Sequence, residues 1–158
     1  MVSNELIASL MVTASTLSVL PALEVAEYPS VQTLTVEQLT KSQCPDDVNA
    51  CRSMVAFYEQ AKNTILIRND PNMEKTLRDS FLLHEMVHVL QYKNSGADIF
   101  KDCQSTINTE RMAYGVQNNY LIDQGVFQRF GDSLTFMTCS DAQDMDSDHV
   151  TFVPVPMK

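Results

Sequence analysis

The sequence has few residues that break regular structure and few positive charges. Its 158 residues include 4 glycines and 6 prolines, too few for repeats or low-complexity spacers built on these residues. Its 11 Lys and Arg residues are outnumbered by 20 Asp and Glu residues, which gives a formal net charge of −9. The basic residues form no cluster, and an acidic surface repels a phosphate backbone. We therefore expect no nucleic-acid partner.

The sequence also lacks an apolar run long enough to cross a bilayer. Its longest apolar stretch, within residues 1–20, is short and rich in Ser and Thr. Glu5 precedes this stretch and no Lys or Arg does, which argues against a signal peptide. We interpret it as an amphipathic first helix capped by Ser3 or Asn4, and we expect no membrane partner. The apolar residues at helical spacing are Leu6, Ile7, Leu10, Met11, Ala14 and Leu17.

The sequence argues against a cysteine-based zinc knuckle, because none of the four cysteines forms a CxxC pair. An even number of cysteines in a small acidic chain instead suggests two disulfides and an oxidising compartment. Of the three pairings that four cysteines allow, we predict Cys44–Cys51 and Cys103–Cys139. The alternative is buried free thiols in a cytosolic protein. Disulfides would place the protein outside the cytosol, secreted or periplasmic.

The remaining pattern predicts one domain over residues 1–158, with a hydrophobic fraction of 44% that is typical of a globular chain. Helices and strands are expected in separate parts of the chain, so the predicted fold class is α+β. After the first helix, the expected elements are a strand at 29–35, a short helix at 35–43, a hairpin of 53–60 and 64–70, a buried helix from Asp70 and Pro71 to Gly96, a helix at 104–123, an extended segment at 133–139 and an extended tail at 140–158.

The stretch "HEMVHVLQ", residues 84–91, contains two of the three histidines of the chain. Residues i and i+4 project from one face of a helix, so His84 and His88 can bind one metal ion. Glu85 flanks that ion and is suited to act as a general base. A chain of this composition contains HExxH by chance in roughly three cases per thousand. Without a ligand, two imidazoles and a carboxylate in a buried helix would be costly, which favours metal binding over hydrogen bonds within a core.

A catalytic zinc ion usually takes three protein ligands and keeps one position open. Cys103 and His149 are candidates for the third ligand, but Glu110 is the better one. Its helix carries a stripe that we expect to face inward, and a carboxylate on a buried stripe favours a cation. The alternative is a salt bridge from Glu110 to Arg78 or Arg111. The other members of the stripe are Ile107, Tyr114, Gln117 and Leu121.

A second stretch, "ERMAYGVQNNYL", begins at Glu110, 22 positions after His88. Together with "HEMVHVLQ" it makes the chain resemble the gluzincin metallopeptidases over roughly residues 50–125. It looks most like the small single-domain members, the minigluzincins and bacterial domains of similar plan. The resemblance implies a small zincin-like fold, in which a short mixed sheet packs on an HExxH helix and a following glutamate helix. It also implies zinc ligands His84, His88 and Glu110, with Glu85 as the base.

The sequence departs from this family at Tyr114. In the thermolysin-like branch an aspartate four residues after the glutamate ligand orients a histidine ligand, and here that position is tyrosine. The metzincin extension is also absent, because Gln91 and Asn94 stand where its glycine and third histidine would be. The role of the aspartate is therefore missing or filled by another residue.

The resemblance further implies that an edge strand between about Met54 and Ile67 binds extended peptide by strand addition. Peptide hydrolysis also needs a residue that stabilises the oxyanion formed from the peptide carbonyl. The candidates are Tyr58, Tyr92, Tyr114 and His149. In some minigluzincins the C-terminal segment fills the cleft of a zymogen, which would give the tail a blocking role.

The sequence-based hypothesis is a zinc-dependent metallopeptidase. Water activated by Zn²⁺ and deprotonated by Glu85 attacks a peptide carbonyl, and the partner is a peptide or protein substrate. The alternative is a non-catalytic binding or structural domain of the same fold with a retained zinc site. A metal-free inhibitor or toxin-like protein is a more distant alternative. Substrate sequence and oligomeric state cannot be inferred from these residues.

Overall fold

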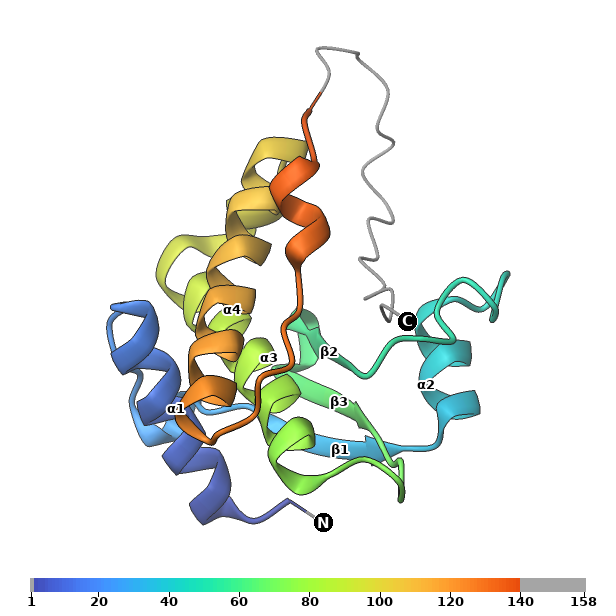
Figure 1. Ribbon diagram of the computed structural model, residues 1–158, viewed down its shortest axis with the longest axis horizontal. Helices are drawn as coiled ribbons and strands as arrows, with labels where there is room; N and C mark the ends of the chain where they lie inside the picture. Colours follow the sequence, from blue (N-terminus) through green and yellow to red (C-terminus); the bar gives the residue numbers. More distant parts are fainter. Residues whose placement is uncertain (1, 140–158) are drawn as a thin grey trace.

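The structure, a computed structural model, describes residues 2–139 and has an α+β fold (Figure 1). Four helices and a three-stranded mixed sheet make up its regular structure, together with short 3-10 turns. The sheet lies beside the helices α3 and α4, as expected from the separation of helices and strands in the sequence. The elements are α1 (Asn4–Ser18), β1 (Ser30–Leu34), α2 (Val36–Gln43), β2 (Ala56–Glu59), β3 (Thr64–Arg68), α3 (Lys75–Ser95) and α4 (Cys103–Asp123).

The sheet has the order β1-β3-β2, with β3 in the centre. Strands β2 and β3 form the expected antiparallel hairpin, and Asn63 closes its turn in the left-handed region at φ 48°. Strand β1 runs parallel to β3, with Val31 opposite Ile65. Strand β2 therefore lies at one edge of the sheet described here, on the side that packs against α3.

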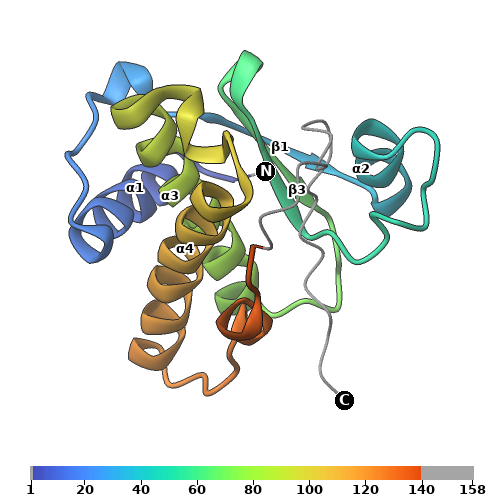
Figure 2. The ribbon, with the colours of Figure 1, turned by 90° about the horizontal axis from the view of Figure 1, so that it is seen from above.

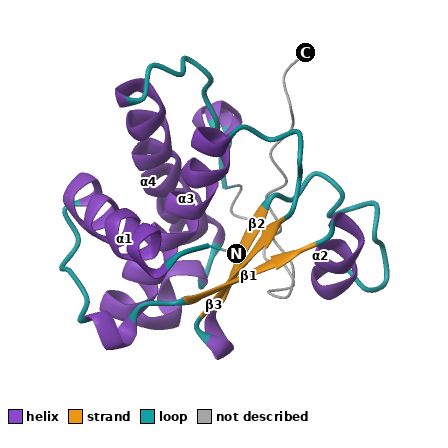
Figure 3. Cartoon of the chain, turned by 90° about the horizontal axis from the view of Figure 1, so that it is seen from below, coloured by secondary structure: helices purple, strands orange, loops and turns teal. Residues whose placement is uncertain are grey.

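Alternate side chains of the strands bury two different faces of the sheet. Tyr58 and Ile65 point into the main core, which α1, α3 and α4 complete. Phe57 and Leu66 point to the opposite face, where Leu39 of α2 covers them in a second small core. Figures 2 and 3 show the resulting arrangement, with α2 on one side of the sheet and the other three helices on the other.

Helix α1 matches the sequence prediction closely. The side chain of Ser3 caps it by accepting a hydrogen bond from the Leu6 N–H, and the helix ends at Ser18, shortly before Pro21. Its predicted apolar face is the one that packs on α3 and α4. The residues buried on it are Ile7, Leu10, Met11 and Ala14.

The predicted start of α3 was wrong by four residues. The helix begins at Lys75 with Glu74 at the N-cap, not after Asp70. Asp70 uses its carboxylate locally instead, by accepting a hydrogen bond from the Asn72 N–H and pairing with Arg68. These contacts stabilise a turn ahead of the helix, a common alternative use of aspartate. The helix does end at Gly96, which has φ 74°.

The predicted extended segment at 133–139 was also wrong in part, because Asp132–Phe136 is a 3-10 helix. This turn belongs to a strap, defined here as residues 126–139, that returns along α4 (Figure 1). The backbone of the strap bonds to side chains of α4 rather than to a strand. Arg111 donates to the Leu134 carbonyl, and Asn118 exchanges two hydrogen bonds with the backbone of Phe130.

Both predicted disulfides are confirmed, and no cysteine is free. The Cys44–Cys51 bridge closes the loop between α2 and β2. The Cys103–Cys139 bridge ties the end of the strap to the first residue of α4. None of the helices in the described part of the chain is both long and apolar enough to span a membrane. The predicted tail, residues 140–158, lies outside the described residues.

Candidate metal centre

Helices α3 and α4 bring three predicted ligands together. The Nε2 atoms of His84 and His88 are 3.1 Å apart. The carboxylate oxygens of Glu110 lie 3.3 Å from Nε2 of His84 and 3.4 Å from Nε2 of His88. All three side chains are buried. The three residues thus form a compact group whose ligand atoms lie within 4.8 Å of one another and can hold a metal ion.

The spacing of these atoms can be compared with the requirement of a metal ion. Bonds of about 2.0–2.1 Å in a tetrahedral zinc site place ligand atoms roughly 3.3 Å apart. The two Nε2 atoms are 3.1 Å apart, and they lie 3.3 and 3.4 Å from the two different carboxylate oxygens of Glu110, so the donor atoms are spaced close to what such an ion requires. Two imidazoles and one carboxylate are also a common ligand set for a metal that activates water.

The local fold explains how these donors meet. His84 and His88 are one helical turn apart in α3, which is buried without interruption from Asp79 to Gln91. Glu110 lies on the predicted inward stripe of α4, and Ile107, Tyr114, Gln117 and Leu121 of that stripe are buried as well. Helix α4 packs along α3, so the stripe faces the two histidines.

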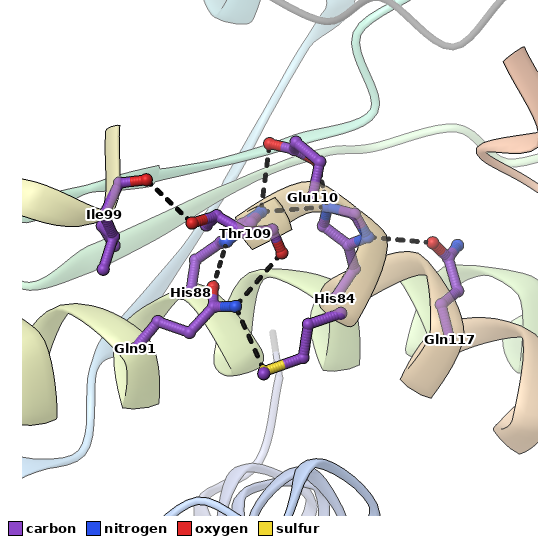
Figure 4. A network of polar contacts seen from close by, with 8 residues as sticks. His84, His88, Gln91, Ile99, Thr109, Glu110 and Gln117 are labelled. Carbon is purple, nitrogen blue, oxygen red and sulfur yellow. Dashed lines mark hydrogen bonds and ion pairs between the residues drawn. The ribbon is translucent and has the colours of Figure 1, made fainter. Parts of the chain in front are cut away.

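Each histidine also makes a hydrogen bond through its other ring nitrogen (Figure 4). Nδ1 of His84 lies 3.1 Å from Oε1 of Gln117, and Nδ1 of His88 lies 2.8 Å from Oε1 of Gln91. Each glutamine uses its amide nitrogen elsewhere. That of Gln117 donates to Ser80, and that of Gln91 donates to the Thr109 carbonyl. The two rings are therefore held on both sides.

The electrostatics of the group are dominated by attraction between its members. Burial alone would lower the pKa of His88, but the charge and hydrogen bond of Glu110 outweigh it and raise this pKa to about 9. Burial alone would raise the pKa of Glu110, but the two facing imidazoles hold it well below its usual range. The group therefore keeps its carboxylate ionised and attracts a positive charge.

Glu85 lies beside the group and is also buried, with 9% of its surface exposed. Burial raises its pKa, the imidazoles of His84 and His88 oppose that effect, and the charge of Glu110 adds to it. No cationic side chain among residues 2–139, other than the two histidines, is close enough to neutralise it. Glu85 is thus a carboxyl group with raised proton affinity next to a metal-binding group.

Within residues 2–139, neither the alternative ligand Cys103 nor an ion pair of Glu110 with Arg78 or Arg111 occurs. Cys103 is in a disulfide, and His149 lies outside the described residues. Arg111 bonds to the strap, and Arg78 pairs with Asp79. Neither arginine therefore neutralises Glu110, which contacts the histidines instead.

Of the candidates for oxyanion stabilisation, Tyr114 lies against the metal-binding group. Its ring centre is 4.4 Å from that of His84, and burial together with the charges of Glu110 and Glu85 raises its pKa. The hydroxyl of Tyr58 donates to Asn63, and the ring of Tyr58 packs edge-on against Tyr92. No hydrogen bond of the Tyr114 hydroxyl is seen within the described residues.

Three residues that position the group were not recognised from the sequence in that role. Gln91 and Gln117 were noted, but not as partners of the histidines. Gly131 approaches the Tyr114 ring so closely that a Cβ atom there would lie 2.5 Å from its Cγ. The one usable signal was the position of Gln117 on the inward stripe, seven residues after Glu110.

Comparison of this chain with models of known protein families, with curated proteins and with solved structures gives no match. The function must therefore be inferred from the residues of the chain and their geometry.

Proposed function

We propose that this protein is a zinc-dependent metallopeptidase of gluzincin type. The observation that supports it best is the arrangement of four side chains. His84, His88 and Glu110 form a buried donor set, and Glu85 lies beside it with a raised pKa. A structural zinc site needs no adjacent carboxyl group, whereas hydrolysis needs a group that accepts and returns a proton.

The ligands in this proposal are His84, His88 and Glu110. A bound Zn²⁺ would polarise a peptide carbonyl and lower the pKa of water toward 7. Two imidazoles and one carboxylate leave a tetrahedral position that the protein does not fill from residues 2–139. That position is the feature that separates a catalytic site from a closed structural one.

Glu85 would carry the proton through the reaction. Its carboxylate takes a proton from the attacking water as the new C–O bond forms, and it gives this proton to the amide nitrogen as the C–N bond breaks. Burial raises the pKa of Glu85 and the nearby imidazoles restrain that rise, which suits a group that is alternately base and acid. Tyr114, packed on His84, is the candidate for a hydrogen bond to the developing oxyanion.

The substrate in this proposal is an extended peptide. Strand β2 uses one edge for its hydrogen bonds with β3 and packs against α3, the helix of the donor set. Its other edge has no strand partner within the described residues. Peptide added at this edge would form backbone hydrogen bonds beside Glu85, because the Tyr58 backbone N–H already lies close enough to lower the pKa of that carboxyl group.

The deciding experiment is Glu85→Gln. We expect hydrolysis of a peptide library to fall by at least about a hundredfold, the lower end of the range for loss of a general base, while zinc content stays at one ion per chain. Glu110→Gln should instead reduce zinc binding. Glu74→Gln, an exposed glutamate at the N-cap of the same helix, is the matched control and should change neither.

Equal hydrolysis by the wild type and Glu85→Gln would rule out the proposed mechanism. Stoichiometric zinc in a wild-type protein that cleaves no member of the library would favour the alternative, a zincin-like binding or structural domain. Mass spectrometry of the metal and of the peptide products separates these outcomes.

A further inference from the structure

We propose that two neutral amides, those of Gln91 and Gln117, hold both histidines of the metal centre as Nδ1–H tautomers, so that both Nε2 lone pairs face the ion. The proposal rests on the metal-binding part of the proposed function and does not require hydrolysis. The two glutamines would orient the histidine ligands. In the family that this chain resembles, an aspartate at the position of Tyr114 orients one of them.

The orientation of the Gln117 amide follows from its contact with Ser80. The Ser80 hydroxyl donates its proton to the Leu77 carbonyl at 2.7 Å. Its oxygen therefore accepts from Nε2 of Gln117, at 3.2 Å. Because the amide nitrogen faces Ser80, its oxygen faces Nδ1 of His84 and must accept a hydrogen bond there. His84 consequently carries its proton on Nδ1.

The orientation of the Gln91 amide follows in the same way. Its nitrogen lies 3.1 Å from the Thr109 carbonyl, which can only accept, so its oxygen faces Nδ1 of His88. Thr109 immediately precedes Glu110, and its own hydroxyl donates to the Ile99 carbonyl. One chain of hydrogen bonds, visible in Figure 4, therefore connects the second histidine to the backbone beside the third ligand.

Both amides are shielded from water, which makes their orientation stable. Gln117 has 0% of its surface exposed and Gln91 has 5%. Rotating the Gln91 amide by half a turn would place its oxygen against the Thr109 carbonyl, and rotating the Gln117 amide would place its oxygen against the Ser80 oxygen, whose proton is donated to Leu77. Such a buried mismatch is costly, since water cannot replace the lost hydrogen bonds. The protons on Nδ1 are therefore fixed before any ion arrives.

The neutrality of these amides has a chemical consequence. A carboxylate in contact with a histidine ligand adds negative charge and makes the imidazole a stronger donor. Gln91 and Gln117 orient the rings without adding charge. Among residues 2–139, Glu110 is therefore the one carboxylate that lies in direct contact with the two imidazole rings. A divalent ion would keep a net positive charge here, and we expect replacing either glutamine by glutamate to tighten zinc binding.

The proposal is tested by zinc affinity, measured by competition with a chromophoric chelator. Gln117→Leu and Gln91→Leu should each weaken zinc binding by about 10–100-fold, the usual effect of losing a residue that orients a ligand. Gln117→Glu and Gln91→Glu should bind zinc at least as tightly as the wild type. Asn94→Leu is the control, because Asn94 lies three residues after Gln91 on α3 but its amide donates to the backbone carbonyl groups of Leu90 and Pro21 and not to a histidine.

Unchanged zinc affinity in folded Gln117→Leu and Gln91→Leu would overturn the proposal, as would an equal loss in Asn94→Leu. A second measurement needs no variant. Long-range ¹H–¹⁵N spectra of the zinc-loaded wild type should show protons on Nδ1 of His84 and His88, and protons on Nε2 instead would contradict it. A chain that binds no zinc would defeat this proposal and the proposed function together, whereas zinc binding without hydrolysis would defeat the latter alone.

Discussion

His88 is in contact with an amide, a carboxylate and a second imidazole at once. Burial opposes positive charge on the ring, but Glu110, Glu85 and Gln91 stabilise it and raise the pKa of His88 to about 9 in the absence of a metal. In the metal-free protein, His88 is therefore protonated at neutral pH and supplies the positive charge beside Glu110. A zinc ion that binds to Nε2 of His88 must displace the proton there. Metal affinity should consequently increase with pH.

This competition predicts a pH dependence of stability for the metal-free protein. His88 has an ordinary pKa of 6.5 and a folded pKa of about 9, so it binds its proton more tightly in the folded state. Its contribution is fully present below pH 6.5 and is lost as pH rises through about 9. Urea unfolding in the presence of a chelator should show a decreasing free energy of unfolding over that interval.

The zinc-loaded protein is the control for this prediction, because its His88 has no proton to lose from Nε2. Its free energy of unfolding should change less over the same interval. A metal-free protein whose stability stays level or increases from pH 6.5 to 9 would show that His88 is not the group that holds the charge.

Single residues also show how far the sequence could predict the site. His84, His88 and Glu110 were identified because their spacing within two helices reveals a common face and a buried stripe. The amides of Gln91 and Gln117 were not identified, because the hydrogen bonds that fix them cross between α3 and α4. The relative position of two helices depends on packing along their whole length, and no local pattern encodes it.

At the scale of elements, α4 and the strap act as one unit beside α3. Asn118 and Arg111 hold the backbone of the strap, and Phe130 packs edge-on against Phe81 of α3. Between these contacts Gly131 adopts φ 77° and touches the ring of Tyr114. The strap thus packs against the ring of Tyr114, and the centre of that ring lies 4.4 Å from the centre of the His84 ring.

Gly131→Ala tests this contact. The new Cβ would lie 2.5 Å from Cγ of Tyr114, so either the ring or the strap must move. We expect peptide hydrolysis to fall by roughly ten- to a hundredfold, the size of effect that a displacement of about 1 Å can produce. Initial-rate assays at saturating zinc measure this change.

Gly125→Ala provides a matched control for the backbone conformation. Gly125 has φ 75°, close to that of Gly131, but a Cβ there would have nothing within 4 Å. It should lose about 1–2 kcal/mol of stability through its conformation alone and keep its activity. Equal activity in both variants would mean that the Gly131 contact does not position Tyr114.

The elements that the sequence predicted best are those stabilised locally. Thr35 caps α2 by accepting from the Gln38 N–H, and the three consecutive apolar residues of β3 are buried. The errors had different causes. Asp70 stabilises a local turn instead of a helix start, and the segment after Gly131 is a 3-10 turn whose Leu134 carbonyl accepts from Arg111 of α4.

For the whole molecule, the two disulfides stabilise different amounts of chain. Cys103–Cys139 closes a loop with a sequence separation of 36, whereas Cys44–Cys51 closes one with a separation of 7. Cross-linking a longer loop removes more conformational entropy from the unfolded chain. The longer loop contains Glu110 and the whole strap, so we expect its closure to stabilise the candidate metal centre as well as the fold.

The double variant Cys103→Ser/Cys139→Ser should therefore lose about 3–4 kcal/mol of stability, and Cys44→Ser/Cys51→Ser about 2–3 kcal/mol. Urea unfolding at equal zinc saturation measures both. The first variant should also bind zinc more weakly, whereas the second should not. A larger loss of zinc affinity in the second variant would contradict the link between the strap and the metal centre.

The Cys103–Cys139 bridge also makes a covalent ring that contains Glu110, Tyr114 and Gln117. The strap within this ring exposes 86% of Phe127 and 84% of Phe136, and proteolytic nicking concentrates at exposed loops. A single cut at either place would open the ring, but the strap residues after the cut would stay joined to the start of α4 through the disulfide. If the proposed peptidase activity let a neighbouring copy make such a cut, the chain would therefore keep those strap residues.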